Sequence, residues 1–223
     1  MSANESMNRF SRSVMDFFFP RRCPFCGKLV GRELLCDDCQ KKLPWTGERA
    51  LSGKGFGRCA APLYYEEQVR RAILELKFNG KTGGLDCFGR LMAECAAEQF
   101  MGEFDTVSWV PVSRKRLKKR GFDQCRLLAA ALCVDWHVRP VETLRKIADN
   151  PPQSGLETPA ERRANVLGVY EPVTENVVGK KILLLDDIVT TGATLGEGVR
   201  VLREAGAADV MCLTLARSRG KKA

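Results

Sequence analysis

Histidine is almost absent from this chain, which has one among 223 residues. His137 lies in the segment VDWHV, far from the other polar motifs of the chain, and we expect it at the surface. The sequence therefore offers no obvious histidine to act as a general base.

Long apolar runs are absent as well. The nearest candidate, VMDFFFP at Val14 to Pro20, is too short to span a bilayer or to form the apolar part of a secretion signal, and a proline ends it. We therefore expect a cytoplasmic protein that does not insert into a membrane.

Glycine-rich nucleotide-binding motifs are missing too. The chain has no G-x-G-x-x-G turn after a predicted strand, which argues against a Rossmann dinucleotide site. GKT occurs at Gly80 to Thr82, but a P-loop needs a glycine five residues before Gly80, and that position is Glu75. The chain also has no internal repeat and no low-complexity tract.

Cysteine, in contrast, is abundant, with ten residues. Four of them follow the pattern C-x2-C-x9-C-x2-C, which is typical of a structural zinc knuckle or ribbon. Little apolar sequence surrounds this segment, so we expect the metal to hold it together. The expected zinc ligands are Cys23, Cys26, Cys36 and Cys39. The other six cysteines are scattered among apolar residues and are predicted to be buried thiols.

After Cys59 the sequence alternates between helical and strand periodicity. Continuous apolar strands between amphipathic helices are typical of a parallel sheet covered on both faces. We therefore predict an α/β domain over residues 59–223, preceded by the zinc segment and a glycine-rich linker over 1–58. The expected helices cover residues 68–78, 85–100, 124–132 and 194–205, and the expected strands cover 106–112, 180–185 and 210–216.

Two adjacent aspartates follow the predicted strand that ends at Leu185, in ILLLDDIVTTGATL. Ligands of parallel sheets bind at the carboxyl ends of the strands. The next loop contains threonine, glycine and alanine and leads into a helix whose start is marked by a capping-box spacing, Thr194 and Glu197. A helix N-terminus behind small residues suits a phosphate, and the aspartates suit sugar hydroxyl groups or a metal ion. The segment predicts a site for a phosphorylated sugar.

Charge is concentrated in two further segments of this chain, whose formal net charge is +9. Ser113 to Arg120 contains six basic residues in eight positions, which suggests contacts with phosphates of nucleic acid or of a small anion, with a solvated loop as the alternative. Leu144 to Val169 is too long and proline-rich for a simple connection, so a lid or disorder is expected. Its polar residues favour a lid over an anion: Arg145, Gln153, Arg162, Arg163 and Asn165.

In their order along the chain, these segments resemble the ComF family of type I phosphoribosyltransferases. The aspartate loop is similar to the family's phosphoribosyl pyrophosphate (PRPP) motif. The similarity extends over nearly the whole chain, through FFFPRRCPFC, CDDC, ILELKFNGK, VPVSRKRLKKRGFDQCRLLA and the pattern from Gln153 to Asn165. It implies an α/β fold of the type I phosphoribosyltransferase kind, with a parallel sheet flanked by helices and a small N-terminal zinc ribbon.

The resemblance also implies a role for each polar segment. Asp186 and Asp187 would hold the ribose hydroxyls of PRPP, and Mg²⁺ would bridge pyrophosphate and ribose oxygens. The segment from Arg145 to Asn165 would close over the reacting centre as a hood, with Arg145 and Arg163 joining the aspartates as catalytic candidates. The 5-phosphate would bind at Thr190, Thr191, Gly192, Ala193 and Thr194, and the pyrophosphate at Val112 and Ser113, assisted by Arg114 and Arg120.

Some features depart from the family pattern. Asp123 stands where family members commonly have asparagine, and Asn150 stands where they have threonine. Many relatives carry further cysteine pairs in the N-terminal region, whereas here only Cys59 follows the first four. We therefore expect one zinc ion.

Two functions follow from the resemblance. One is an enzyme that transfers phosphoribosyl from PRPP to an acceptor that the sequence does not identify. The other is a protein of DNA uptake that holds single-stranded DNA, alongside other competence or DNA-uptake proteins, with PRPP binding as a regulatory or vestigial property. Phe122 is the one aromatic residue beside the basic run, which weakens the DNA hypothesis because such sites stack bases on aromatics. A homodimer is compatible with both.

Overall fold

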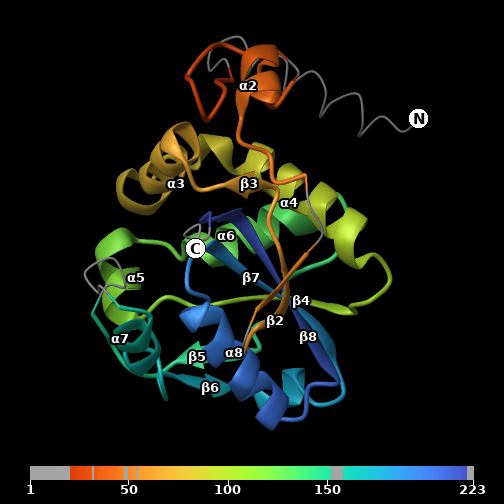
Figure 1. The fold of residues 1–223 in the computed structure, drawn as a ribbon, viewed down its shortest axis with the longest axis vertical. Helices are drawn as coiled ribbons and strands as arrows, with labels where there is room; N and C mark the ends of the chain where they lie inside the picture. The colour runs from red at the N-terminus through yellow and green to blue at the C-terminus, as the bar shows by residue number, and fades with distance from the viewer. Residues whose placement is uncertain (1–20, 32, 48–49, 54, 152–157, 220–223) are drawn as a thin grey trace, which may run out of the picture.

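The computed structural model describes residues 21–219 apart from 32, 48–49, 54 and 152–157 (Figure 1). Two features of the sequence analysis, the apolar segment Val14 to Pro20 and the hood residue Gln153, lie outside the described residues. Among the described helices, none combines the length and the apolar character needed to cross a membrane.

A six-stranded sheet lies at the centre of the main domain (Figure 1). Its order is β1-β2-β8-β7-β4, and β3 pairs with the end of β8. The β1–β2 pair is antiparallel and the other pairs are parallel, which confirms the predicted α/β class. The strands are β1 (Leu51–Gly53), β2 (Gly57–Ala60), β3 (Leu63–Tyr64), β4 (Thr106–Trp109), β7 (Lys181–Val189) and β8 (Asp209–Arg217).

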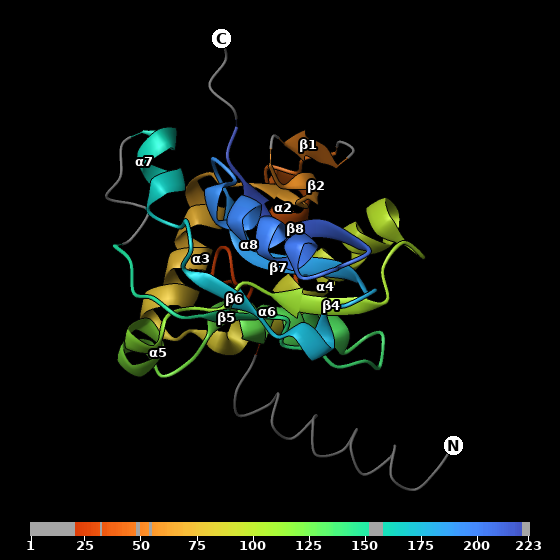
Figure 2. The ribbon, with the colours of Figure 1, turned by 90° about the horizontal axis from the view of Figure 1, so that it is seen from below.

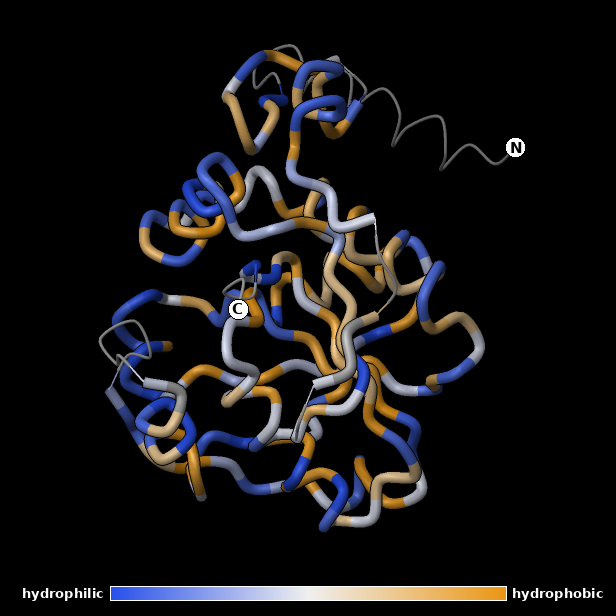
Figure 3. The backbone as a smooth tube through the Cα atoms, viewed as in Figure 1, coloured by the Kyte–Doolittle hydropathy of each residue, from blue (hydrophilic) through white to orange (hydrophobic). Residues whose placement is uncertain are grey.

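Strand β7 shows why its sequence is a continuous apolar run. Successive side chains point to opposite faces, so Leu183 and Leu185 join the core on one face while Ile182 and Leu184 join the core on the other. Helices α3 (Glu67–Asn79), α4 (Leu85–Phe100) and α6 (Gln124–Cys133) lie on the first face, and α8 (Ala193–Glu204) lies on the second (Figures 1 and 2). Figure 3, in which the backbone is coloured by residue hydropathy, shows hydrophobic residues gathered along the central strands.

The four predicted helices are confirmed, and the strands differ at their ends. β4 stops at Trp109, three residues before the predicted end, after which Pro111 has no N–H to donate. β7 continues past both aspartates to Val189, because the equally long β8 pairs with it as far as Arg217. The basic run forms a helix, α5 (Arg114–Arg120), which Ser113 caps through a hydrogen bond from the Arg116 N–H.

The N-terminal segment packs directly on the main domain. It contains one short helix, α2 (Asp37–Lys42), and the ring of Phe25 lies edge-to-face with that of Phe88 in α4, at 5.7 Å between centroids. Cys23, Cys39 and Leu43 belong to the same buried cluster as Phe88. The glycine-rich stretch expected to be a linker contributes β1 and most of β2 to the sheet, so the expected boundary between residues 58 and 59 falls within β2.

The polar segment Leu144 to Val169, called the hood below, begins with β5 (Leu144–Lys146) and is followed directly by β6 (Tyr170–Pro172), which pairs with β5 in a separate two-stranded antiparallel sheet. Between these strands, helix α7 (Pro159–Ala164) begins with a complete capping box formed by Thr158 and Glu161. The two short 3-10 helices of the described chain are η1 (Thr82–Gly84) and η3 (Thr174–Asn176).

Candidate functional site

Asp186 and Asp187 lie at the carboxyl edge of the sheet, although β7 itself continues beyond them. β4 pairs with β7 only as far as Trp109 and Leu185, so the next two residues of β7 lie where their neighbour on that side has ended. The chain leaving β4 leads into α5 and α6. The carboxylates are thereby placed between the α5–α6 region and the loop from β7 to α8.

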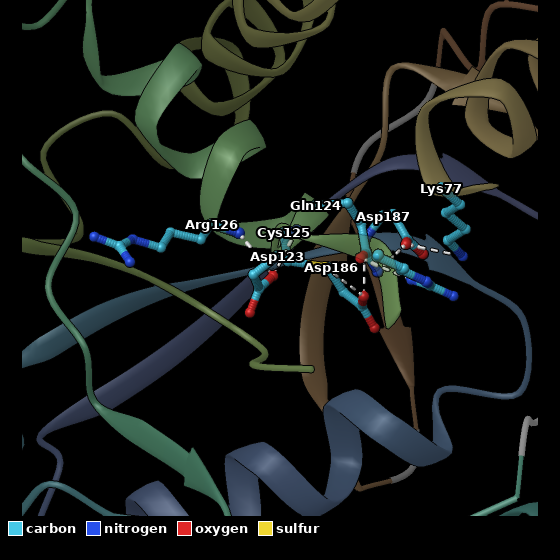
Figure 4. Close-up of polar contacts among 8 residues, drawn as sticks. Lys77, Asp123, Gln124, Cys125, Arg126, Asp186 and Asp187 are labelled. Atoms are coloured by element: carbon cyan, nitrogen blue, oxygen red, sulfur yellow. Dashed lines mark hydrogen bonds and ion pairs between the residues drawn. The ribbon is translucent and has the colours of Figure 1, made fainter. Parts of the chain in front are cut away.

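Asp187 is buried and is held by a network of side chains from three elements (Figure 4). Its Oδ2 lies 2.8 Å from Nζ of Lys77, at the end of α3, and accepts a 3.1 Å hydrogen bond from Nε2 of Gln124. Oε1 of Gln124 in turn accepts from Nη1 of Arg120, at 2.8 Å. Burial acts to lower the pKa of Lys77, but the ion pair with Asp187 outweighs it and the pKa is raised. Asp187 is therefore a charge that the protein already neutralises.

Asp186 has different surroundings. Its Oδ1 accepts hydrogen bonds from the Asp187 N–H at 2.8 Å and from the thiol of Cys125 at 3.3 Å. Burial, together with the neighbouring charge of Asp187, raises the pKa of Asp186 to about 7. A ligand that donates hydroxyl groups or brings a cation to Asp186 stabilises its ionised form. Of the two carboxylates, Asp186 is therefore the one better suited to accept from the hydroxyl groups of a ligand.

The two carboxylates also fit a divalent cation. Oxygen atoms of Asp186 and Asp187 and the sulfur of Cys125 all lie within 4.8 Å of one another. Mg²⁺ is bound in proteins by one or two carboxylates together with substrate phosphates, whereas a protonated thiol is a poor ligand for it. Burial raises the pKa of Cys125 well above its usual value, so the thiol stays protonated and the aspartates are the donors that fit Mg²⁺.

The loop from β7 to α8 forms a pocket with Asp186. The pocket is lined by Asp186 and the segment Ile188–Leu195. Gly192, at the N-cap of α8, has the left-handed φ of 73° that brings the chain into the helix, and the Ala193 N–H donates to Oγ1 of Thr191 at 3.4 Å. The predicted phosphate residues Thr190 to Thr194 are thus brought together at the N-terminus of a 12-residue helix, whose first N–H groups and dipole favour an anion.

The capping box predicted at this helix is wrong. The helix begins at Ala193, one residue before Thr194, and no side chain caps it. Glu197 instead accepts the Gly168 N–H at 2.8 Å and forms an ion pair with Arg200 at 2.7 Å. Glu197 therefore ties the end of the hood to α8.

Phe56, in the turn between β1 and β2, lies directly on this loop. A Cβ atom at Gly192 would meet Cε1 of the Phe56 ring at 2.1 Å, so glycine is required by contact as well as by φ. Phe56 could not be predicted as a site residue, because it lies in a glycine-rich stretch whose lack of periodicity predicts a linker.

The predicted pyrophosphate loop at Val112 and Ser113 is held by Asp123. The Val112 N–H donates to Oδ2 of Asp123 at 3.0 Å, and Oδ1 accepts from the N–H groups of Cys125 and Arg126 at the start of α6. Burial raises the pKa of Asp123. An asparagine at this position has one acceptor oxygen instead of two. The departure from the family pattern therefore adds an intramolecular partner for the Val112 N–H.

The hood is closed at its base and contacts the loop. Nδ2 of Asn150 donates to the Asn165 carbonyl at 2.7 Å, and Nδ2 of Asn165 donates to the Pro151 carbonyl at 3.0 Å. Arg116 of α5 donates to the Asn150 carbonyl at 2.8 Å. Nη1 of Arg162, on α7, lies 3.5 Å from Oγ1 of Thr190.

The four predicted site arginines differ in their surroundings. Arg120 points inward to Gln124, whereas Arg114 is exposed on α5. Arg145 is exposed and pairs with Glu142 at 3.8 Å, and Arg163 is exposed on α7. In the described part of the chain, neither Arg145 nor Arg163 is bonded to Asp186 or Asp187.

Lys146 lies on the opposite face of β5 from Arg145, with its Nζ 5.2 Å from the ring centroid of Tyr170. Burial, followed by the charge of Arg116, lowers the pKa of Lys146 to about 8, and Asp186 acts in the opposite direction. Lys146 is therefore a half-buried cation whose charge interacts with that of Asp186, and it could not be predicted because a three-residue strand has no readable period.

Lys77 is also missed, although the sequence contains a signal for it. It lies four positions after Ile73 on the buried face of α3, where a charged residue needs a partner. His137 is exposed, as predicted.

The four N-terminal cysteines form a site of their own. Their sulfur atoms all lie within 4.8 Å of one another, and those of Cys26 and Cys36 are 3.5 Å apart. A tetrahedral zinc ion with Zn–S bonds of about 2.3 Å requires sulfur atoms about 3.8 Å apart, so the donor set fits zinc. Four protein ligands leave no open position, which is typical of a structural metal.

Two protein families match this chain, one over each of its two regions. The Phosphoribosyl transferase domain family matches residues 117–223, and the Double zinc ribbon domain family matches residues 14–72, which supports a structural zinc at the four cysteines.

Individual relatives match most of the chain. Competence protein ComFC of Streptococcus pneumoniae is 30% identical over 198 residues, which cover 87% of this chain and 80% of that protein. DNA utilization protein YhgH of Escherichia coli K12 is 26% identical over 215 residues, covering 88% and 84%. Among solved structures, a phosphoribosyltransferase from Corynebacterium diphtheriae is 22% identical, with a TM-score of 0.36, and covers 69% of this chain and 72% of that chain.

Proposed function

This chain belongs to the ComF family, and from that premise we propose that it binds PRPP with Mg²⁺ at the loop from β7 to α8 and acts in the uptake or handling of single-stranded DNA. The observation that carries the PRPP proposal is the pocket that Asp186 and Ile188–Leu195 form at the N-terminus of α8. The N-terminus of α8 suits a phosphate dianion, and the Asp186 carboxylate suits hydroxyl groups. Both line the same pocket, so one sugar phosphate could contact both.

Each part of PRPP has a place in this geometry. The 5-phosphate lies in the Thr190–Thr194 loop, and the ribose hydroxyls donate to Asp186. The pyrophosphate would lie toward Val112 and Ser113, and Lys146, whose charge interacts with that of Asp186, is a further candidate cation for it. Bound Mg²⁺ supplies neutralisation of the pyrophosphate charge. Asp187 holds the site in shape through its ion pair with Lys77.

The DNA part of the proposal rests on the relatives and on charge. The relatives are named for competence and for DNA utilization. The chain has a formal net charge of +9, and the exposed side of α5 is basic. Phosphate contacts of this kind give sequence-independent, salt-sensitive binding.

Transfer of phosphoribosyl to an acceptor, without a DNA role, is the second candidate. Two contacts favour it, because Arg162 contacts Thr190 and the Gly168 N–H donates to Glu197 of α8, and a hood that closes over the site would exclude water from a reactive sugar. Displacement at the anomeric carbon would then depend on leaving-group stabilisation and positioning.

Calorimetric titration of Mg-PRPP, with and without a short single-stranded DNA, tests the proposal. Asp186→Asn keeps the size of the side chain and removes the acceptor charge, and we expect it to weaken binding at least 10-fold. Asp135→Asn, an exposed carboxylate that follows the end of α6 and pairs with Arg90, is the control and is expected to bind as the unchanged protein does. Unaltered affinity in Asp186→Asn would reject the site. A measured release of pyrophosphate with no DNA binding would favour the second candidate.

A further inference from the structure

Phe78 is a large apolar side chain that the fold leaves uncovered. It lies in the last turn of α3 and is 67% exposed, whereas its neighbour Lys77 points inward to Asp187. A single exposed phenylalanine is common at protein surfaces, so what makes Phe78 notable is the set of residues beside it.

The end of α3 lies beside the basic helix α5, although the two helices are far apart in the sequence. The guanidinium carbon of Arg120 lies over the Phe78 ring, 5.0 Å from its centroid. The Phe122 ring approaches Gly80, where a Cβ atom would lie 3.6 Å from it. The fold therefore places an exposed aromatic side chain next to the basic run, whereas in the sequence Phe122 is the one aromatic residue beside that run.

The outer face of α5 offers cations without matching acids. Arg114, Lys115, Lys118 and Lys119 are exposed, with Leu117 43% exposed between them. Within the described residues, no carboxylate forms an ion pair with any of these four. Their charges are therefore available to an extended polyanion.

We propose that Phe78, Arg120 and the four exposed cations of α5 form a binding surface for single-stranded DNA, in which an unpaired base stacks at Phe78 while neighbouring phosphates lie along α5. The proposal rests on the DNA role proposed above, and its test does not require PRPP. Stacking on an aromatic ring requires a base that is not paired, so the surface favours single strands over duplex. The guanidinium of Arg120, already over the ring, contributes a second planar face.

The test is fluorescence anisotropy of a labelled oligothymidylate with three sets of variants over a range of salt concentrations. Phe78→Leu keeps an apolar side chain and removes the aromatic face, and Phe78→Tyr restores it. We expect Phe78→Leu to weaken binding about 5- to 100-fold without changing the salt slope, and Phe78→Tyr to bind as the unchanged protein does. Lys118→Glu with Lys119→Glu is expected to weaken binding and to flatten the salt slope by about one to two units.

A matched charge control comes from the opposite end of the sheet. Lys180→Glu with Lys181→Glu makes the same change of charge on exposed lysines at the amino end of β7, and we expect binding within about twofold of the unchanged protein. An equal loss in this control would show that net charge alone governs binding and would overturn the surface. Equal affinity of Phe78→Leu and the unchanged protein, or equal affinity for a duplex of the same length, would overturn the stacking site.

These outcomes are distinct from failure of the proposed function. Mg-PRPP calorimetry on Phe78→Leu is expected to match the unchanged protein, because Phe78 does not line the pocket of the PRPP loop. No binding of single-stranded DNA by the unchanged protein would reject the DNA role itself, and the surface with it. DNA binding that survives all the α5 and Phe78 changes would keep the role and place the surface elsewhere.

Discussion

At the scale of single residues, the pair of Lys77 and Asp187 links α3 to β7 through a 2.8 Å contact between side chains that are 19% and 7% exposed. Taking either charge away leaves the other in a poorly hydrated position with its partner missing. The adjacent carboxylate of Asp186 raises that penalty, because it adds a second negative charge within the same small volume.

Lys77→Met is therefore expected to lower the free energy of unfolding by about 3 kcal/mol, measured by urea denaturation at pH 7. The double change Lys77→Met with Asp187→Asn removes both charges, and we expect it to recover part of the loss. Two single losses that simply add in the double variant would show that the pair does not interact.

Lys146 gives a prediction about pH. Its pKa falls from the ordinary 10.5 to about 8 in the folded protein, mainly through burial. Below pH 8, Lys146 carries its proton in both the folded and the unfolded protein, so the full cost of burying the charged ammonium lowers the stability of the folded state. Between pH 8 and 10.5 the unfolded chain binds more protons than the folded one, so stability rises with pH in that window.

Lys146→Met should thus stabilise the protein at pH 7 by about 1 to 2 kcal/mol, less than the pKa difference alone implies because water still reaches the ammonium. The gain should shrink as the pH is raised from 8 towards 10.5. Urea denaturation across this range measures it, with the exposed Lys180→Met as control. A gain that does not change with pH would show that packing, and not charge, is responsible.

At the scale of elements, the turn between β1 and β2 packs on the loop before α8, and Gly192 is the residue that permits it. An alanine at this position would have to adopt the left-handed conformation, which costs about 1 kcal/mol. Its Cβ atom would also lie 2.1 Å from the Phe56 ring, closer than non-bonded atoms can approach. Gly179 has a similar φ of 71°, and no atom lies within 4 Å of the position that its Cβ would occupy, which makes it a matched position for the backbone effect alone.

We expect Gly192→Ala to be less stable than Gly179→Ala by more than about 1 kcal/mol, and to lose Mg-PRPP binding because the loop must move away from Phe56. Thermal unfolding and calorimetry measure the two effects. Equal stability of the two variants would mean that the turn and the loop are not in contact in solution.

Elements with a strong apolar period could be predicted from the sequence, and those without one could not. A regular apolar face is buried in the helices α3, α4 and α6, and a continuous apolar run is buried in the strand β7. These patterns make all four elements recognisable in the sequence. α5 has no buried residue and owes its start to the Ser113 cap, while β1, β2, β5 and β6 are three or four residues long. The aspartate loop is identifiable because its residue types are unusual together, whereas Phe56 and Lys146 reach the site only through tertiary contacts.

At the scale of the whole molecule, the zinc segment is part of the main core. Phe25 packs on Phe88 of α4, and Arg71 of α3 donates to the Phe25 carbonyl at 2.8 Å. The metal therefore supports a surface of the main domain as well as its own loop.

Removal of zinc by a chelator should unfold residues 21–43 and lower the melting temperature of the main domain, while β7 and β8 stay protected. Elemental analysis combined with hydrogen exchange measures both effects. Unchanged exchange in α4 after the metal is lost would show that the zinc segment does not support the core. The absence of zinc from the purified protein would contradict the metal site.

The side chains from Phe78 to Asp187 form one connected path, through Arg120 and Gln124, and Lys77 beside Phe78 closes it. Under the two proposals above, a base that moved Arg120 would alter its hydrogen bond to Gln124, and Gln124 also donates to Asp187, the neighbour of Asp186. Thermodynamic linkage then makes the two affinities reciprocal: the factor by which DNA alters PRPP binding equals the factor by which PRPP alters DNA binding.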